Sequence, residues 1–315
     1  MHPALSVIFF TSASGAGYGL LAILGVGYFF DLTPEDSAFG FSAVGIALVL
    51  VTTGLLSSTF HLGHPERAWR ALSQWRSSWL SREGLLALLS YIPISAFAIG
   101  WLIFDSNEDI YAVNALGMSV LCLATIYSTS MIYASLRTVH AWCNYWVPPV
   151  YLSIALMTGM VLLNALLLIF KHPVPAISIA TLIVIIIALA IKLGYWRFIN
   201  MTQSGSTTET ATGLHQFGKV SMVQSPHSQD NYLLKEMGYK VARKHADKLR
   251  RISLLCGFII PFLLTLVSFD SYATIGIGGA ILAVVFCMLG VIIERWLFFA
   301  EAKHTVMLYY GNSSA

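Results

Sequence analysis

Long apolar runs separated by short polar stretches make up most of the chain. A membrane-crossing helix needs about 20 mostly apolar residues, and eight runs meet that length. Pro261 lies inside the seventh run and is expected to kink its helix. The pattern predicts an all-α, polytopic membrane protein with about eight transmembrane helices, built as a single domain over residues 1–315. The predicted spans are 7–30, 40–60, 84–104, 112–135, 148–170, 174–196, 252–269 and 273–299.

Small residues cluster in the first and the last of these spans. Small side chains let helix backbones approach closely inside a membrane, so both spans are predicted to lie inside the bundle. The residues concerned are Ser12, Ser14, Gly15, Gly17 and Gly19 in the first span, and Gly276, Gly278, Gly279 and Ala280 in the last.

The composition excludes a soluble catalytic domain. The chain is 57% hydrophobic and 10% charged, whereas soluble domains carry about 25% charged residues. A net charge of +3, with its basic residues in loops between apolar spans, gives no reason to expect a nucleic-acid partner. The four cysteines have no metal-ligand spacing, so no iron–sulfur cluster and no other metal site is predicted on this chain.

Charge is distributed unequally between the two faces of the predicted bundle. The loops at 61–82, 136–147 and 197–251 share one face with both termini, and among the 18 Lys and Arg residues only Lys171 belongs to a loop on the other face. Cytoplasmic loops carry the excess of basic residues, so both termini and the 197–251 loop are predicted to be cytoplasmic. The basic stretch from Lys240 to Arg251 is predicted to be an interfacial helix, either on lipid headgroups or against a soluble partner.

The segment between the second and third spans holds the most informative residues, FHLGHPERAWRALSQWRSSWLSREG from position 60 to 84. His61 and Glu83 both stand where a polar loop meets an apolar span, and ionisable groups there favour a functional interpretation. Histidine and a partly desolvated glutamate can exchange protons near neutral pH, as a quinone site requires. Arg67 could hold Glu83 ionised or polarise a quinone oxygen. The alternative is a His–Glu–Arg network that only fixes the loop.

Other functions have less support from the residue pattern. A transporter is expected to place ionisable groups near mid-membrane, whereas Lys192 and Glu294 lie closer to span ends. No histidine lies at the centre of a span, so no haem is expected. A b-type haem near the cytoplasmic edge remains an alternative, since His61, His64, His140 and His304 lie there.

Over its whole length the chain resembles the membrane anchor subunits of the dimethyl sulfoxide reductase family of molybdoenzymes. The likeness includes the start MHPALSVIFFT, the H-x-G-H-P-x-R loop and the S-R-E-G that follows. In that family, quinol binding is associated with residues matched here by His61, Gly63, Arg67 and Glu83. The resemblance therefore implies a quinone site at these four positions and no catalytic residue on this chain.

Within that family the chain looks most like the anchors of cytoplasmic, membrane-bound sulfite-oxidising enzymes. It carries their GLHQFGKV-like and NYLLKEMGYKVARKHADKLRR-like segments at 213–220 and 231–251. In the dimethyl sulfoxide reductases the loop between the second and third spans faces the periplasm, but here that loop is rich in arginine and is predicted to be cytoplasmic. This difference favours sulfite oxidation over sulfoxide reduction.

The resemblance also implies partners and a place in the cell. An iron–sulfur electron-transfer subunit and a molybdopterin catalytic subunit are expected on the cytoplasmic face, where they carry the clusters and the molybdenum cofactor. The chain itself would be the quinone-reactive, non-catalytic subunit of a sulfite dehydrogenase in a bacterial inner membrane. The alternatives are an anchor that takes electrons from menaquinol for a dimethyl sulfoxide reductase-type complex, and a purely structural anchor.

Overall fold

A computed structural model describes residues 5–59, 64–103, 109–224, 245–269 and 274–310, and its long apolar helices confirm the predicted fold class. Within these described residues, eight helical segments are long and apolar enough to cross a membrane. Seven of them are single helices, and the remaining one joins three shorter elements between Ala246 and Val267. The spans are α1 (Leu5–Phe29), α2 (Ser37–Thr59), α3 (Trp79–Ile103), α4 (Asp109–Ala134), α5 (Val147–Ile169), α6 (Pro175–Met201), the unit α10 (Ala246–Leu254), η2 (Leu255–Ile259) and α11 (Ile260–Val267), and α12 (Thr274–Ala300).

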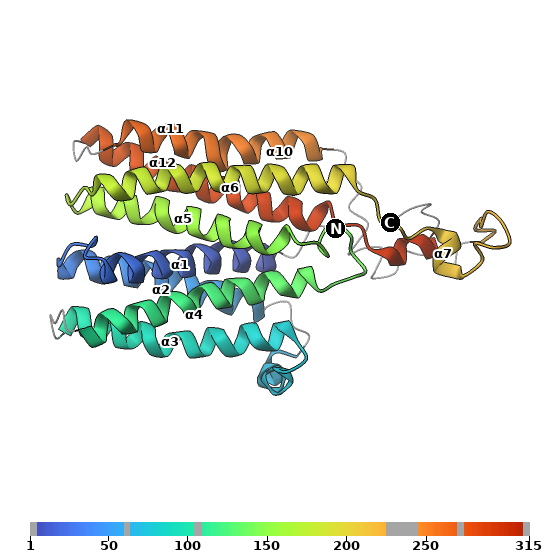
Figure 1. The fold of residues 1–315 in the computed structure, drawn as a ribbon, viewed down its shortest axis with the longest axis horizontal. Coiled ribbons are helices and arrows are strands. Elements are labelled where there is room, and N and C mark those ends of the chain that lie inside the picture. Colours follow the sequence, from blue (N-terminus) through green and yellow to red (C-terminus); the bar gives the residue numbers. More distant parts are fainter. Residues whose placement is uncertain (1–4, 60–63, 104–108, 225–244, 270–273, 311–315) are drawn as a thin grey trace.

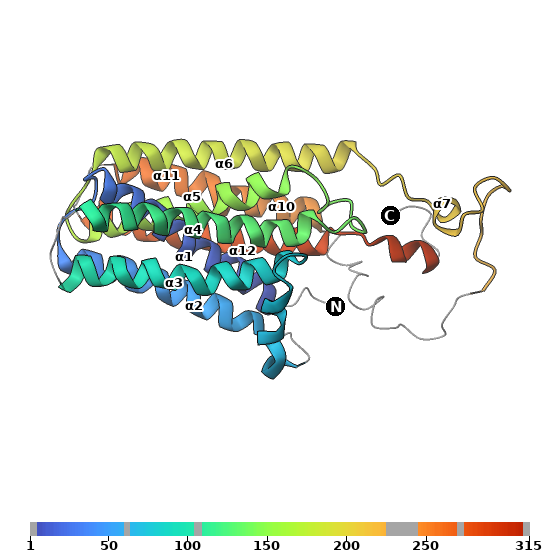
Figure 2. The same cartoon turned by 60° about the horizontal axis from the view of Figure 1, so that its bottom comes forward.

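The spans lie side by side along the long axis of the molecule, with α1 and α5 at the centre (Figures 1 and 2). α1 packs against α2, α4 and α5, while α5 also packs against α6 and α12. In the most apolar 18-residue stretch of α1 and of α5, 78% of the residues are buried. The corresponding share in the other spans is 28–39%. The two central helices therefore build the core, and the outer helices present apolar side chains to lipid.

Glycines allow α1 and α5 to touch through their backbones. A Cβ atom at Gly19 would clash with the carbonyl of Ala155, and a Cβ atom at Gly159 would clash with Gly19 itself. This contact confirms that the small residues of the first span place it inside the bundle.

The same prediction is only half right for the last span. Gly279 and Ala280 of α12 are buried, but Ile275, Leu282 and Leu289 are exposed. One face of α12 therefore points away from the protein, and α5 is the second central helix instead.

The early start of α3 and the distortion of the seventh span have identifiable reasons. α3 begins at Trp79, five residues early, and the Ser78 hydroxyl accepts a hydrogen bond from the Ser81 amide (3.4 Å), as an N-cap residue does. Glu83 is therefore within the helix rather than before it. In the seventh span, the Ile260 amide bonds to the Leu255 carbonyl in a π-helical turn just before Pro261, so the proline distorts the helix as expected.

Shorter elements gather at one end of the bundle, which we call the η1 end. They are η1 (Pro65–Gln74), α7 (Thr208–Thr212) and η3 (Thr305–Tyr310), and α1 begins and α12 ends at this same end (Figure 1). The Tyr309 hydroxyl donates to the Ala211 carbonyl (2.9 Å), which joins η3 to α7.

The described part of the basic stretch continues the seventh span instead of forming a separate interfacial helix. α10 begins at Ala246 and runs directly into η2. Arg250 of α10 donates to Glu301 (2.7 Å) and to Asn200 (3.2 Å), which holds this basic turn against α12 and α6. The residues from 240 to 244 lie outside the described part of the chain.

Candidate functional site

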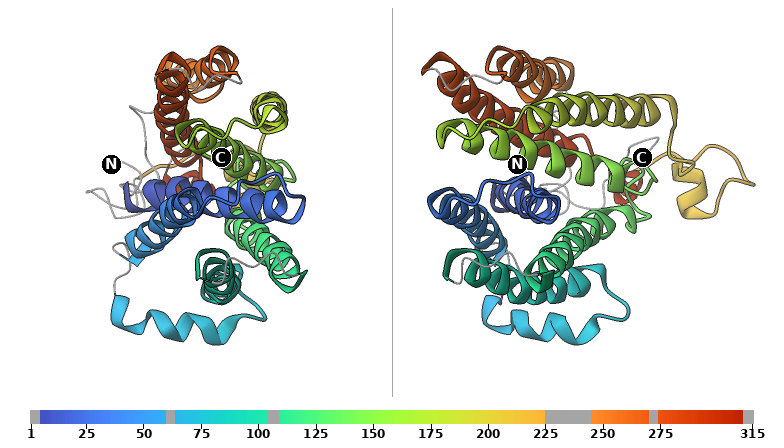
Figure 3. Two further views of the ribbon diagram at one scale, coloured as in Figure 1. Left: turned by 90° about the vertical axis from the view of Figure 1, so that its left-hand side faces the viewer. Right: turned by 60° about the vertical axis from the view of Figure 1, so that its left-hand side comes forward.

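The 3-10 helix η1 lies crosswise to the bundle axis beside the start of α3 (Figure 3). Pro65 stands at its first position, where the missing N–H costs no hydrogen bond. The tryptophans Trp69 and Trp75 are both exposed, as expected for an aromatic belt at a membrane–water interface. η1 therefore has the orientation and composition of an interfacial helix.

Side chains of α3 hold η1 in place. The Ser81 hydroxyl donates to the Ala71 carbonyl of η1. Arg82 donates from Nε to the Trp75 carbonyl (2.9 Å) and from Nη2 to the Arg76 carbonyl (2.7 Å), which satisfies carbonyls at the end of η1. The Arg82 guanidinium also lies 4.2 Å from the centroid of the Trp79 ring. The loop and the first turn of α3 therefore form one fixed junction.

Glu83 points into the protein directly beneath this junction. Its side chain is only 4% exposed, and Thr129 of α4 donates a hydrogen bond to its Oε1. Among the described residues no basic side chain forms an ion pair with Glu83. A buried carboxyl group with one hydrogen bond can take up or release a proton with little local rearrangement, because no ion pair has to break.

Arg67 lies apart from Glu83. Its side chain is 58% exposed, and its Nε is 3.7 Å from Oε1 of Glu66. The same Glu66 oxygen lies 3.1 Å from Nδ1 of His64. A His–Glu–Arg network therefore exists on the exposed side of the loop, and the structure does not pair Arg67 with Glu83. His61 and Gly63 lie outside the described residues.

A second group of ionisable side chains lies fully inside the bundle, and the sequence argument had identified only part of it. Glu294 of α12 accepts hydrogen bonds from Lys192 of α6 and from Arg295, and the three side chains are 0–2% exposed. Lys192 Nζ lies 4.4 Å from the Tyr195 ring centroid, and Arg295 Cζ lies 4.0 Å from the Tyr151 ring centroid. Arg295 was missed, although an arginine within an apolar run was the signal that could have found it.

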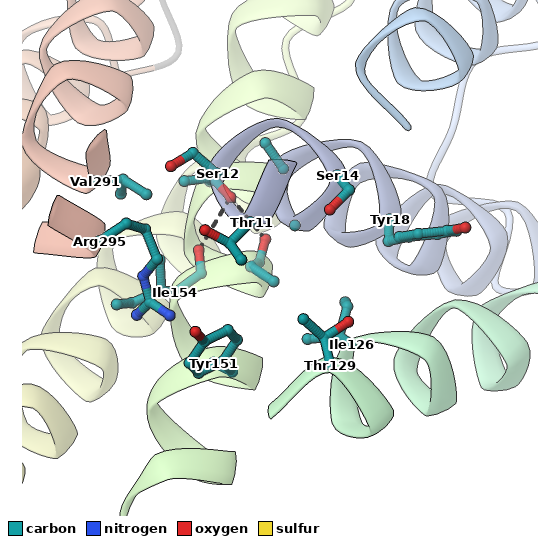
Figure 4. A pocket seen from close by; sticks show the side chains of 14 residues that line it. Thr11, Ser12, Ser14, Tyr18, Ile126, Thr129, Tyr151, Ile154, Val291 and Arg295 are labelled. Carbon is teal, nitrogen blue, oxygen red and sulfur yellow. Dashed lines mark hydrogen bonds between the residues drawn. The ribbon is translucent and has the colours of Figure 1, made fainter. Parts of the chain in front are cut away.

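A pocket lies between Thr129, the hydrogen-bond partner of Glu83, and Arg295 of this ion cluster (Figure 4). α1, α4, α5 and α12 each contribute side chains to its wall, including Thr129, the hydrogen-bond partner of Glu83, and Arg295 of the cluster. Water molecules can place their centres in about 20 Å³ of it. The pocket thus has polar side chains at both ends and room for a water molecule.

The described residues offer no evident metal site. No three His, Cys, Asp or Glu side chains among them are grouped as metal ligands would be. All four cysteines are free.

Comparison with known proteins identifies the family. Residues 1–311 match the family described as "DMSO reductase anchor subunit (DmsC)". The chain belongs to this family. A DmsC-family chain is the membrane anchor subunit of a complex of the DMSO reductase family, which implies partner catalytic subunits. The fold described above, with eight apolar helices and no soluble domain among the described residues, agrees with that role.

Two relatives have curated names. The C subunit of the sulfite dehydrogenase of Allochromatium vinosum is 33% identical over 330 aligned positions, which cover 99% of this chain and 99% of that protein. The C subunit of the anaerobic dimethyl sulfoxide reductase of Escherichia coli is 32% identical over 146 positions, which cover 43% of this chain and 50% of that protein. This DmsC-family chain is therefore homologous to the sulfite dehydrogenase protein over its full length.

Proposed function

We propose that this DmsC-family anchor passes electrons from sulfite oxidation to quinone at the cytoplasmic face of a bacterial inner membrane. The molybdopterin subunit would convert sulfite and water to sulfate, two protons and two electrons. An iron–sulfur subunit would deliver the two electrons to this chain. The full-length likeness to the sulfite dehydrogenase protein supports this substrate, since the likeness to the sulfoxide reductase anchor covers less than half of the chain.

The proposed quinone site comprises His61, Gly63, Arg67 and Glu83. The proposed site rests mainly on the position of Glu83. Its carboxyl group is buried one turn inside α3, beneath the interfacial helix η1. A bound quinone accepts two electrons and two protons in becoming quinol. Glu83 lies in the second turn of α3 at the η1 end, from which those protons would come, and His61 is the second proton donor of the proposal. Arg67, exposed on η1, would orient the ring rather than hold Glu83 ionised.

The charges at the two ends support the proposed orientation. The η1 end carries Arg67, Arg70, Arg76 and Arg82, while the described loops at the other end carry Lys171 as their single Lys or Arg together with Asp31, Glu35 and Asp36. The positive-inside rule therefore supports a cytoplasmic η1 end. The same end presents α7 and η3 beyond the bundle (Figures 1 and 2), which would form the docking face for the iron–sulfur subunit.

The test is to replace Glu83 by Gln in the intact complex. Gln keeps the size of the side chain and a hydrogen-bond acceptor for Thr129 but cannot carry the proton. Quinone reduction by sulfite should be lost, whereas sulfite oxidation with a soluble dye should continue, because the dye takes electrons before the membrane step. Asp247→Asn removes a carboxylate from an exposed position at the same end and should leave both activities unchanged. Normal quinone reduction by the Glu83→Gln complex would show a purely structural anchor instead.

A further inference from the structure

The segment that follows α7 exposes four apolar side chains at the η1 end, and we call residues 213–224 the Phe217 loop. Phe217 is 84% exposed and Val223 is 99% exposed, while Leu214 and Met222 are also exposed. Exposed apolar side chains of the spans face lipid, but this loop lies well beyond the ends of the spans (Figures 1 and 2). Contact with lipid therefore does not account for it, and exposed apolar side chains of this kind are typical of a protein-binding surface.

The Phe217 loop has a backbone that is fixed by its own hydrogen bonds. Gly213 ends α7 in a left-handed conformation (φ 73°), which turns the chain away from the helix. The Leu214 amide bonds to the Glu209 carbonyl (3.0 Å), and the Phe217 amide bonds to the Leu214 carbonyl (2.9 Å). The Glu209 carboxylate accepts a hydrogen bond from the Val220 amide (3.2 Å), which ties the loop back to α7. A loop that is ordered before it binds pays a smaller entropic cost on binding.

The position of the loop suits the attachment of a soluble subunit. The described loops at the other end of the bundle, 30–36 and 170–174, are short connections between spans. At the η1 end, by contrast, residues 202–224 extend beyond the bundle (Figure 2). An anchor subunit of the DMSO reductase family has partner subunits to hold. Among the described residues, the surface available for holding them is therefore at the η1 end.

The charges around the loop indicate the chemistry of the partner surface. Lys219 of the loop is exposed, as are Arg67 and Arg70 of η1 at the same end, and the loop itself contains no Asp or Glu. Charges of opposite sign orient two proteins as they associate. A partner that fits would therefore offer an apolar pocket for the Phe217 ring, with acidic side chains around it. An apolar centre with a polar rim is the usual composition of a protein–protein interface.

We propose that Phe217 is the central contact between this chain and the iron–sulfur subunit, and that its ring fills an apolar, acid-rimmed pocket of that subunit. The inference rests on the proposed function, in which the iron–sulfur subunit is the one that must reach this chain to deliver electrons. An aromatic ring buried at the centre of an interface contributes far more to binding than the residues around it. Phe217 should therefore matter more for attachment than the polar side chains beside it.

Phe217→Ser tests the contact, because it removes the ring without adding a charge and changes a side chain that packs little against its own chain. In the whole complex, the affinity for the iron–sulfur subunit should fall about thirtyfold or more, as expected for the loss of an aromatic residue at the centre of an interface. Sulfite oxidation with a soluble dye should move from washed membranes to the soluble fraction, with its total unchanged. Quinone reduction by sulfite should fall in proportion.

Two control variants separate loss of the ring from general damage to the loop. Gln216→Ser shortens the neighbouring exposed side chain and should leave the soluble subunits on the membrane. Phe217→Leu keeps an apolar side chain and should restore most of the attachment that Phe217→Ser loses. Equal release by Gln216→Ser and Phe217→Ser would show that the ring has no special part, and would overturn the proposal.

A photo-crosslinking residue, p-benzoylphenylalanine, in place of Phe217 identifies the partner directly. Irradiation of the intact complex should join this chain to the iron–sulfur subunit, as identified by mass spectrometry of the cross-linked peptides. A cross-link only to the molybdopterin subunit, to residues 225–244 of this chain or to lipid would overturn the proposal. Full retention of the soluble subunits by Phe217→Ser would overturn it as well.

The docking contact and the quinone site fail separately in these experiments. Release of the soluble subunits by Phe217→Ser, together with normal quinone reduction by Glu83→Gln, would leave the docking contact standing and remove only the quinone site. Loss of quinone reduction in Glu83→Gln, with the soluble subunits retained by Phe217→Ser, would leave the quinone site standing and remove the docking contact.

Discussion

Glu83 of α3 accepts a hydrogen bond from the hydroxyl of Thr129 of α4, and both side chains are buried. The Thr129 hydroxyl also lies 3.1 Å from the carbonyl of Thr125, one turn earlier in its own helix. Its single hydrogen can serve only one of these two acceptors at a time. Thr129 is therefore suited to change partners as the proton on Glu83 comes and goes.

Replacing Thr129 by Val should leave Glu83 without its partner while keeping the shape of the side chain. The loss of a hydrogen bond to a buried group should lower the stability of the complex by about 1–3 kcal/mol. Quinone reduction should fall by about tenfold, with no change in dye-linked sulfite oxidation. Thr129→Ser restores the hydroxyl and should recover most of the rate. Normal quinone reduction in Thr129→Val would show that the hydroxyl does not matter here.

The buried ion cluster should depend on charge balance. Glu294→Gln leaves Lys192 and Arg295 as two buried cations without a counter-ion, which should destabilise the protein by about 3–5 kcal/mol. The added change Lys192→Met restores the original net charge of the site. The double variant should therefore be more stable than Glu294→Gln alone, as measured by thermal unfolding of the purified complex in detergent. A double variant that is no better than the single one would mean that individual hydrogen bonds, and not net charge, determine stability.

The spans were predictable because backbone groups in lipid must bond within their own helix, so the length of each apolar run sets the helix. The centre of the bundle was harder to find. Lipid-facing and protein-facing side chains are both apolar, so the sequence of α5 does not distinguish its buried faces from those of an outer helix. Only the contact between Gly159 and Gly19 shows that Gly159 lies in a close helix–helix contact.

The site was predictable in part for a related reason. An ionisable residue at the edge of an apolar run marks a position of interest, and Glu83 stood out in this way. Its partner Thr129 did not, because a threonine in a membrane helix often bonds to its own backbone. The possible pairing of Arg67 with Glu83 relied on closeness in sequence, but η1 places the arginine on its exposed side, next to Glu66.

Attachment of the C-terminal segment should weaken in mild acid. Burial lowers the pKa of His304 from its ordinary value, and its Nδ1 accepts a hydrogen bond from the Val306 amide (3.0 Å). The neutral imidazole is therefore the form that the folded segment prefers. Its contribution is fully present above the unfolded pKa of about 6.5 and is lost as pH falls through that value toward the lower folded pKa.

Hydrogen–deuterium exchange can follow this pH dependence. The Thr305 amide bonds to the Thr138 carbonyl (3.0 Å) and reports whether the segment is attached. Its protection, after correction for intrinsic exchange, should decrease below about pH 6.5. In His304→Asn the protection should be independent of pH over this range. Undiminished protection at pH 5 in the unmodified protein would contradict the prediction.

The direction of insertion can be read from two exposed positions at opposite ends of the bundle. Gln203 follows α6 at the η1 end, and His172 lies in the loop between α5 and α6 at the other end. If the arginine-rich η1 end is cytoplasmic, an impermeant thiol reagent added to intact cells should label His172→Cys and not Gln203→Cys. Breaking the cells should expose both, and the unmodified protein corrects for labelling of its own four free cysteines. The reverse pattern would place η1 and Glu83 at the periplasmic surface, where protons for quinone reduction could not come from the cytoplasm.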